Sequence, residues 1–389
     1  MKNRYQKKLD SLQREGLLRQ LFPVAKMECQ FIYLNGKKLV NFSSNDYLGY
    51  GSDLQFRNKF YRDLQNREEL PAPGALSSRL MVGNHREYLL LESFLEQLYG
   101  KPSLVFGSGY HANIGIIQAL GDKKTVFFAD KLVHASIIDG LKISGSTFFR
   151  YRHNDTEHLR DLLKKHRSAF EYAVIISESL FSMDGDIAPL TQLIELKHEF
   201  DAAIYLDEAH AIGVRGNRGL GLSEECGLLQ EIDFLVGTFG KAVASSGAFV
   251  ISSKEIKDYL INVMRSLIFT TGLSPLQIAW TRFVLQAMVS DTEKREKLAY
   301  NSRYFIKKLS EAGVNAHSQS QIIPIFIGEN NKTIKLVEYL RSNGQLVWPI
   351  RPPTVPKNTA RIRLSVNAGH DRMVMDRFVE ILKEGLDAI

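Results

Sequence analysis

The chain has 389 residues, of which 44% are hydrophobic and 24% are charged, and its formal net charge is +7. This composition is typical of soluble globular proteins and excludes collagen-like and intrinsically disordered chains, and the length allows two or three domains. The two cysteines, Cys29 and Cys226, exclude a disulfide framework and have no metal-ligand spacing, so we expect a cytoplasmic protein without a metal site.

The positive charge does not by itself indicate a partner. The lysines and arginines are spread along the sequence rather than gathered with aromatic residues, so we expect no nucleic-acid binding. A bias toward polyanionic small molecules, such as phosphates or coenzyme A, is equally compatible with the charge. No apolar stretch approaches the roughly 18 to 20 residues that a membrane span needs, so no membrane association is expected.

Residues 1–21 have the pattern of a basic amphipathic helix, with Leu9, Leu12 and Leu17 near one face. The apolar core of a secretory signal is absent. Such a helix either packs on the body of the protein or lies on a membrane surface, and the first interpretation is favoured.

Short apolar runs alternate with helical patterns through the middle of the chain. Strands buried by helices on both faces have this pattern, which predicts a mostly parallel sheet in an α/β domain. The predicted strands are Leu104–Phe106, Thr125–Ala129, Thr147–Tyr151, Tyr172–Ser177, Ala203–Asp207, Phe234–Gly237 and Ala248–Ile251.

The pattern changes after Pro275. One long helix is predicted from Gln277 to Ala312, and strands near 322–327 and 360–364 and a closing helix from Asp371 follow it. This order indicates a smaller α+β domain. We therefore expect three parts: an N-terminal helix and arm (1–45), a large domain (46–285) and a small C-terminal domain (286–389).

A phosphate site is predicted at residues 107–113, Gly-Ser-Gly-Tyr-His-Ala-Asn, which follow a strand and open a helix. Backbone N–H groups at a helix N-terminus bind phosphate, and glycines let the backbone approach closely. Thr238, before a second turn, can add a hydroxyl group to the same phosphate. Taken alone, the segment is more often only a turn.

Two further candidates lie at Asp207 and His210. Asp207 ends a predicted strand, where ligands bind in doubly wound sheets, and a carboxylate there can pair with a protonated pyridine nitrogen. His210 can then hydrogen-bond a ring oxygen. The alternative is that Asp207 only caps the next helix.

Lys241 lies among small residues in the segment GTFGKAVASSGAF. Lysines are usually exposed, but desolvation in so cramped a turn favours an amine that exchanges Schiff bases at neutral pH. His134 follows another strand and can stack on a cofactor ring, although a core histidine is the alternative, and Ser182 follows a further strand. Each residue is weak evidence alone. The ordered set of phosphate cradle, aspartate and lysine predicts pyridoxal 5'-phosphate.

The sequence resembles the α-oxoamine synthase family, a branch of fold-type I pyridoxal-phosphate enzymes. The resemblance extends over nearly the whole chain, through the segments NFSSNDYLGY, SSRLMVGNH, FGSGYHANIG, HASIIDG, YRHND, ESLFSMDGD, LDEAHAIGV, GTFGKA and IRPPTVPKNTARIRLS. It implies a fold-type I transferase with a large, mostly parallel domain and a smaller α+β domain. Members join a small amino acid to an acyl-CoA with loss of CO2.

Within the family, the run 350–356 and the segment 18–24 are most similar to the member that condenses L-alanine with a pimeloyl thioester, of coenzyme A or acyl carrier protein, in biotin synthesis. Sister members that use other amino acids and acyl chains remain open. A non-catalytic nucleotide-binding protein is a further alternative, which the absence of a Gly-x-Gly-x-x-Gly strand–helix unit disfavours.

The resemblance also implies roles for individual residues. Lys241 forms the Schiff base, Asp207 pairs with the pyridine nitrogen, and His134 stacks on the ring. The ring oxygen contacts His210 and Ser182. Gly109, Tyr110 and Thr238 bind the phosphate, as do Thr270 and Thr271 of the partner subunit, which implies a homodimer with shared active sites. Asn45 and Arg363 bind the carboxylate of the amino acid. Arg19 and Thr354 contact the acyl substrate.

Overall fold

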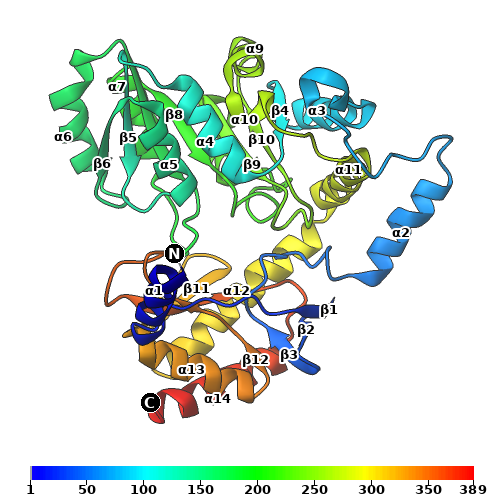
Figure 1. The fold of residues 1–389 in the computed structure, drawn as a ribbon, viewed down its shortest axis with the longest axis vertical. Helices are drawn as coiled ribbons and strands as arrows, with labels where there is room; N and C mark the ends of the chain where they lie inside the picture. The colour runs from blue at the N-terminus through cyan, green and yellow to red at the C-terminus, as the bar shows by residue number, and fades with distance from the viewer. Residues whose placement is uncertain (1) are drawn as a thin grey trace. The chain divides into compact units, whose positions relative to one another are not determined.

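The computed structural model describes residues 2–389, which pack into two compact units. Unit 1 is Met1–Leu54, Ser182–Asp186 and Glu296–Ile389, and unit 2 is Gln55–Phe181 and Ile187–Arg295 (Figure 1). Among residues 2–389, no helix combines the length and apolar character that crossing a membrane requires. The boundaries expected from the sequence, at 45/46 and 285/286, stay predictions, because a compact packing unit need not coincide with a domain.

Unit 2 is built on a seven-stranded sheet with the strand order β4-β10-β9-β8-β7-β5-β6. All seven strands were predicted, with ends within one residue of those observed. Only β10 runs antiparallel to its neighbours, so the predicted mostly parallel sheet is confirmed. The strands are β4 Ser103–Phe106, β5 Thr125–Asp130, β6 Thr147–Tyr151, β7 Tyr172–Glu178, β8 Ala203–Asp207, β9 Phe234–Thr238 and β10 Ala248–Ile251.

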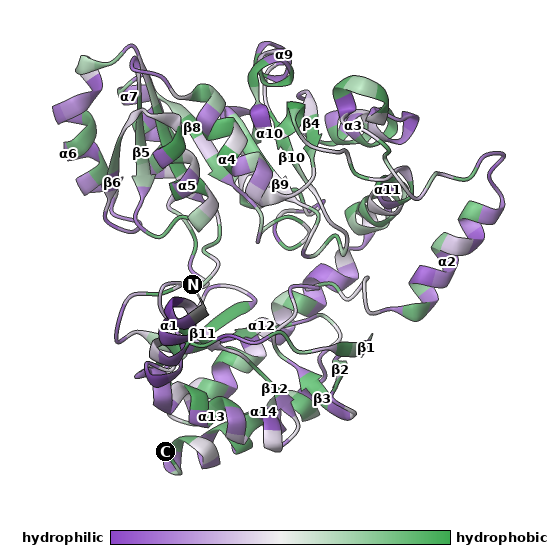
Figure 2. Cartoon of the chain, viewed as in Figure 1, coloured by the Kyte–Doolittle hydropathy of each residue, from purple (hydrophilic) through white to green (hydrophobic). Residues whose placement is uncertain are grey.

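Helices cover this sheet, and most of its strand residues are apolar and buried. On one face, helices α4 (Gly109–Leu120), α5 (Ala135–Ser144), α9 (Lys254–Val263) and α10 (Arg265–Ile268) pack a core that includes Ile116, Ile137, Leu260, Phe127 and Val236. Figure 2 shows the strands as largely hydrophobic. The other helices of unit 2 are α2 Leu54–Gln65, α3 Arg86–Tyr99, α6 Thr156–His166, α7 Leu190–Glu199, α8 Leu222–Glu225 and α11 Pro275–Ser290, with short turns η1 Arg79–Gly83, η2 Arg167–Ala169 and η3 Leu229–Glu231.

The long helix predicted from Gln277 to Ala312 is wrong. The structure has two helices, α11 and α12 (Thr292–Glu311), separated at Asp291. The backbone of Asp291 leaves the helical region, and its Oδ1 accepts a 3.1 Å hydrogen bond from the N–H of Lys294. Asp291 therefore caps the start of α12, a role for which aspartate is well suited.

The described residues of unit 1 form two small sheets, helices α1, α13 and α14, and most of α12. One sheet has the order β1-β2-β3-β12 and the other β11-β14-β13. The strands predicted near 322–327 and 360–364 and the closing helix are present, and Asp371 caps that helix by accepting from the N–H of Val374. The elements are β1 Val24–Glu28, β2 Phe31–Leu34, β3 Lys37–Asn41, β11 Ile322–Gly328, β12 Gln345–Leu346, β13 Pro349–Ile350, β14 Ala360–Ser365, α1 Lys2–Arg14, α13 Asn330–Ser342 and α14 Arg372–Asp387.

The N-terminal helix is shorter than the 21 residues predicted. Helix α1 ends at Arg14, because Gly16 has a positive φ of 65° that no longer continues a helix. The side chains of Asn330 and Arg351 donate to the carbonyl groups of Glu15 and Gly16. The end of α1 is therefore packed on unit 1, as the favoured interpretation expects.

Candidate active site

Polar residues follow the carboxyl ends of four parallel strands of unit 2. His134 follows β5, Glu178 ends β7, Asp207 ends β8, and Lys241 lies in the turn after β9. Because these strands are parallel, their carboxyl ends share one edge of the sheet, which is where ligands bind in open α/β sheets. The predicted lysine, aspartate and histidine thus come from neighbouring strand ends.

The carboxylate of Asp207 is held by two donors. Its Oδ2 accepts a 2.8 Å hydrogen bond from Nδ2 of Asn113 on α4, and its Oδ1 accepts a 2.9 Å hydrogen bond from the N–H of Ala209. Asp207 is only 6% exposed, and no helix follows it directly. The helix-cap alternative is therefore wrong: the carboxylate closes a tight turn toward Ala209. His210, in the same turn, is also buried.

His134 occupies the N-cap of α5. Its Nδ1 lies 2.7 Å from Oγ of Ser136 and accepts from the N–H of Ser136 at 3.3 Å. The main-chain N–H of His134 donates a 2.5 Å hydrogen bond to Oε1 of the buried Glu178. The residue is exposed on the surface of this chain, so it is not a core histidine.

Asp207 and Lys241 act electrostatically on the same neighbours. Desolvation by the surrounding protein lowers the pKa of His134, although the residue remains accessible to solvent. The charge of Asp207 raises this pKa, and the charge of Lys241 lowers it further. Burial raises the pKa of Glu178 well above its usual range, Asp207 raises it further, and Lys241 lowers it. These four residues therefore form one electrostatic cluster, and burial favours the neutral form of Glu178.

The segment predicted to bind phosphate lies at the start of α4. Ser108 caps this helix by accepting from the N–H of His111, and Gly109 and Tyr110 are its first two residues. A Cβ atom placed on Gly109 would lie 3.7 Å from Oγ1 of Thr238, so the two predicted phosphate-binding segments face each other. Thr238 also donates to the carbonyl of Gly247 at 3.0 Å.

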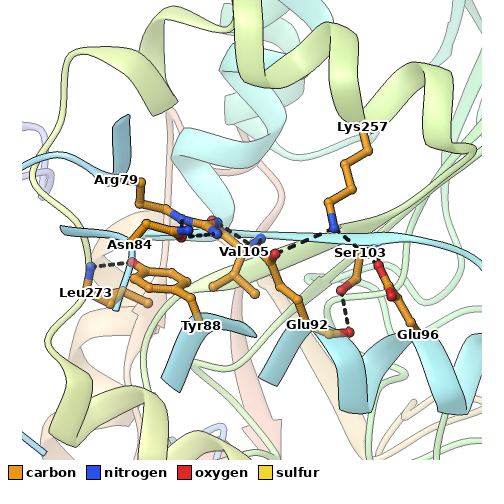
Figure 3. A network of polar contacts seen from close by, with 9 residues as sticks. All are labelled: Arg79, Asn84, Tyr88, Glu92, Glu96, Ser103, Val105, Lys257 and Leu273. Carbon is orange, nitrogen blue, oxygen red and sulfur yellow. Dashed lines mark hydrogen bonds and ion pairs between the residues drawn. The ribbon is translucent and has the colours of Figure 1, made fainter. Parts of the chain in front are cut away.

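Thr270 and Thr271 precede a loop that is anchored inside unit 2. The N–H of Leu273 donates 2.6 Å to the hydroxyl of Tyr88, whose ring lies under the guanidinium of Arg79 at 4.0 Å. Figure 3 shows this network, in which Arg79 pairs with the buried Glu92 at 2.7 Å. The loop that carries the two threonines is therefore fixed by buried polar contacts.

In unit 1, Arg363 is the centre of a second polar cluster. Its Nη1 donates to Oδ1 of Asn45 at 3.2 Å, its Nη2 donates to the hydroxyl of Tyr47 at 3.2 Å, and its Nε donates to the carbonyl of Ser182 at 2.5 Å. Ser365 accepts a further bond of 2.7 Å. The structure thus brings together Arg363, Asn45 and Ser182, which come from three separate parts of the sequence.

The two residues predicted to contact the acyl substrate lie near each other. The exposed side chain of Arg19 donates a 3.2 Å hydrogen bond to the carbonyl of Pro352. In the same turn, the N–H of Thr354 donates a 3.1 Å hydrogen bond to the carbonyl of Arg351. Arg351 in turn donates to the carbonyl of Leu18. The predicted N-terminal segment and the Arg-Pro-Pro-Thr turn therefore make one surface of unit 1.

Sequence reasoning missed several polar residues of the site. Ser136 and Glu178 lie in segments that carry the resemblance but have no predicted role, and Asn113 is predicted only as part of the phosphate-binding segment 107–113. The available signal was a polar residue in an otherwise apolar element: Asn113 is 2% exposed, Ser136 0% and Glu178 3%. Buried polar groups are retained where they are hydrogen-bonded, so each needed a partner.

These residues fit pyridoxal phosphate. The first turn of α4 with Thr238 offers N–H and hydroxyl donors to a phosphate, the buried Asp207 suits a protonated pyridine nitrogen, and Lys241 supplies an amine. In the described part of the chain, no group of three or more histidine, cysteine, aspartate or glutamate side chains is arranged to hold a metal ion.

Comparisons with known proteins agree with this geometry. Residues 37–382 match the model of the family "aminotransferase class I and II". The 8-amino-7-oxononanoate synthase of Haemophilus ducreyi is 45% identical over 372 residues, which cover 94% of this chain and 96% of that protein. Among solved structures, a PLP-bound serine palmitoyltransferase from S. paucimobilis matches with a TM-score of 0.90, 27% identity and coverage of 99% and 97%.

The solved 8-amino-7-oxononanoate synthase from Francisella tularensis matches with a TM-score of 0.74 and 25% identity, and the match covers 90% of this chain and 98% of that chain. The family match, the relatives and both structures therefore agree on the fold, and the family match together with the PLP-bound structure indicates pyridoxal phosphate as the cofactor. The chain belongs to the aminotransferase class I and II family and, within it, to the α-oxoamine synthase branch of fold-type I pyridoxal-phosphate enzymes.

Proposed function

We propose that this chain catalyses the decarboxylative condensation of L-alanine with a pimeloyl thioester, which gives 8-amino-7-oxononanoate, the free thiol and CO2 in biotin synthesis. One observation carries the proposal: the 45% identity to the Haemophilus ducreyi synthase extends over nearly the whole of both chains. The two polar clusters, around Asp207 in unit 2 and Arg363 in unit 1, supply the groups that this reaction needs.

Most of the proposed cofactor contacts come from unit 2. Lys241 Nζ would bind its aldehyde, Asp207 would pair with the pyridine nitrogen, and His134 would lie against the ring. The phosphate would take the helix dipole and N–H groups of Gly109 and Tyr110. The further contacts in this proposal are Thr238 to the phosphate, His210 and Ser182 to the ring oxygen, and Thr270 and Thr271 to the phosphate of the partner subunit.

Arg363 would bind the carboxylate of alanine, with Asn45 beside it. Asn45, Tyr47, Ser182 and Ser365 take four of its five N–H groups, so the guanidinium would offer the carboxylate its positive charge and the remaining N–H of Nη2. The contacts of Arg363 to Asn45, Tyr47 and Ser182 support this role, because they hold the guanidinium in one place before any substrate binds.

Proton transfer falls to Lys241. When bound, pyridoxal phosphate supplies an electron sink that stabilises negative charge at the Cα of alanine. Lys241 Nζ would remove the Cα proton, and His134 would present its ring to the same region. The new carbon–carbon bond would form between this Cα and the thioester carbonyl carbon as the thiolate leaves. The original carboxylate would then depart as CO2, and Lys241 would return a proton to Cα.

The acyl chain would meet Arg19 and Thr354. A pimeloyl group ends in a carboxylate or its ester, and the exposed guanidinium of Arg19 suits the charged form. The contact between Arg19 and the carbonyl of Pro352 supports a shared surface with Thr354.

We also propose a homodimer that works in the cytoplasm. Apolar side chains near the 270–274 loop are exposed: Leu76 by 85%, Met81 by 75%, Val82 by 70% and Phe269 by 71%. A second copy of the chain would cover them and bring Thr270 and Thr271 to its partner. Both cysteines are free, which suits a reducing compartment.

Serine palmitoyltransferase is the second candidate, because its solved structure matches the fold with the TM-score of 0.90. Its 27% identity is far below the 45% shared with the Haemophilus ducreyi synthase. Glycine C-acetyltransferase and 5-aminolevulinate synthase are further sister enzymes with the same lysine chemistry.

A substrate panel tests the proposal. Thiol release is measured with L-alanine, glycine and L-serine, each combined with pimeloyl-, acetyl-, succinyl- and palmitoyl-CoA, and with pimeloyl-acyl carrier protein. We expect turnover to be fastest for L-alanine with a pimeloyl thioester. Faster turnover with serine and palmitoyl-CoA, or with glycine and a short acyl-CoA, would overturn it.

A further inference from the structure

A buried chain of hydrogen bonds connects Asp207 to His134. The hydroxyl of Tyr205 lies 2.6 Å from Oδ1 of Asn113, and Nδ2 of Asn113 lies 2.8 Å from Asp207 Oδ2 and 3.0 Å from Ser136 Oγ. Ser136 Oγ is in turn 2.7 Å from Nδ1 of His134. The chain crosses three elements: β8 carries Tyr205 and Asp207, α4 carries Asn113, and α5 begins after His134.

One order of donors and acceptors gives every group along this chain a partner. An ionised carboxylate only accepts, so the amide nitrogen of Asn113 must face Asp207, and its oxygen accepts from Tyr205. The second amide N–H of Asn113 then donates to Ser136 Oγ. The one hydroxyl proton of Ser136 is left to donate to Nδ1 of His134.

A second donor supports the same order at His134. The main-chain N–H of Ser136 points at Nδ1 from 3.3 Å, and a main-chain N–H cannot accept. Nδ1 therefore keeps its lone pair. In a neutral imidazole with an accepting Nδ1, the proton is on Nε2.

From this geometry we propose that Asn113 and Ser136 are positioning residues that fix His134 as the Nε2–H tautomer and tie its ring to the carboxylate of Asp207. The proposal rests on the proposed function in one respect: His134 and Asp207 are the residues assigned there to the cofactor ring. The tautomer itself follows from the chain's own contacts.

Burial makes the arrangement rigid. Tyr205 and Ser136 are fully buried, Asn113 is 2% exposed, and none of these groups can exchange its partner for bulk water. A buried polar network in which every member is satisfied specifies one arrangement, because any flipped amide or rotated hydroxyl leaves an unpaired group.

The charges around His134 are consistent with a neutral ring. Asp207 on β8, Lys241 after β9 and Asp139 on α5 act on it, and Glu178 on β7 accepts its main-chain N–H. Desolvation outweighs the two carboxylates and lowers the pKa of the ring. His134 therefore presents an N–H donor at Nε2 rather than a positive charge, and a neutral ring does not repel a protonated pyridine.

The test is the protonation state of His134 in the holoenzyme. The protein is labelled with 15N-histidine, and long-range proton–nitrogen correlation spectra are recorded at neutral pH. The His134 signals are identified by their loss in His134→Gln. We expect a pyridine-type nitrogen at Nδ1 and a pyrrole-type nitrogen at Nε2. A proton on Nδ1, or on both nitrogens, overturns the proposal even if no other variant folds.

Ser136→Ala tests the positioning role. Removing the hydroxyl leaves only the weaker main-chain donor, so the two 15N shifts of His134 should move toward each other as the tautomers interconvert. Ser103→Ala is the matched control, because Ser103 is also 0% exposed and its hydroxyl donates to the carbonyl of Glu92 instead. Unchanged shifts in Ser136→Ala would overturn the role of Ser136.

The substrate panel run on the same samples separates this inference from the proposed function. An enzyme that prefers another amino acid but has the Nε2–H form refutes only the proposed substrate. An enzyme that condenses alanine with a pimeloyl thioester but carries the proton on Nδ1 refutes only the positioning.

Discussion

The side-chain amide of Asn113 donates a 2.8 Å hydrogen bond to Asp207, although the two residues are 94 positions apart in the sequence. With the N–H of Ala209 on the other oxygen, the carboxylate is surrounded by donors. Helix α4, whose first turn is the proposed phosphate site, is thereby coupled to the strand end that would hold the pyridine nitrogen. One buried amide thus keeps two parts of the site in register.

Asp207→Asn should damage both stability and turnover. An amide NH2 group would face either the NH2 group of Asn113 or the N–H of Ala209, and one buried donor would lose its acceptor, at a cost of about 1–3 kcal/mol. Without the negative charge, we expect turnover to fall by about a hundredfold or more. Urea unfolding and steady-state kinetics measure the two effects. A variant with wild-type stability and turnover would show that the carboxylate is not needed there.

Arg363→Lys should weaken the binding of alanine. An ammonium group cannot reproduce a planar fork that also donates to Asn45, Tyr47 and Ser182. Losing charge-assisted hydrogen bonds of about 1.5–3 kcal/mol corresponds to a rise of roughly tenfold to a hundredfold in the alanine KM.

Arg341→Lys is the matched control, because Arg341 is also partly buried in unit 1 but donates to the carbonyl of Val347 and stacks on Trp348. The alanine KM of this control should stay within about twofold of wild type, since twofold is about 0.4 kcal/mol. An unchanged KM in Arg363→Lys would remove Arg363 from the carboxylate site.

His370 should make stability depend on pH. Its Nδ1 accepts from the N–H of Asn367, its Nε2 faces the carbonyl of Asn41, and burial lowers its pKa from 6.5 to about 4. Between these values the unfolded chain binds a proton that the folded chain does not, so stability is complete above pH 6.5 and is lost as the pH falls toward 4. The expected loss from pH 7 to pH 4 is about 3 kcal/mol.

His370→Gln should remove that part of the pH dependence, because glutamine does not titrate. The comparison is the difference in unfolding free energy between wild type and variant, measured by urea titration at several pH values. This difference should shrink as the pH falls. If it stays constant from pH 7 to pH 4, the buried histidine does not control acid stability.

Glu92 should matter more than an exposed acid of the same kind. It pairs with Arg79 at 2.7 Å, and their side chains are 7% and 10% exposed (Figure 3). Glu92→Ala leaves a buried guanidinium without its partner and should destabilise the protein by about 3–5 kcal/mol.

Asp258→Ala is the control, since it breaks an exposed pair with Lys254 and should cost less than about 1 kcal/mol. Urea unfolding of both variants compares the two costs. Equal effects would mean that the Arg79–Glu92 pair gives the 270–274 loop no special support.

The sequence predicted the strands of unit 2 well because most of them are buried on both faces and read as short apolar runs. It failed at Asp291, where two apolar helical patterns adjoin and only the capping side chain marks the break. It also did not reveal that Ser182–Asp186 packs with Glu296–Ile389, because such long-range packing leaves no periodic signal.

The site follows the same division. Lys241, Asp207 and the Gly-Ser-Gly turn could be predicted because each follows an apolar strand with a recognisable turn. Asn113 and Glu178 could not, because their roles depend on which strand ends become neighbours in the sheet. The sequence shows that they are polar, and the fold decides what they contact.

The most direct test of the central claim uses L-alanine labelled with 13C at its carboxyl carbon. Incubation with a pimeloyl thioester should release labelled CO2 and free thiol in a one-to-one ratio, and Lys241→Ala should reduce both to less than a few per cent of wild type. Thiol release without labelled CO2 would show hydrolysis instead of condensation. That result, or normal turnover in Lys241→Ala, would contradict the proposed decarboxylative condensation.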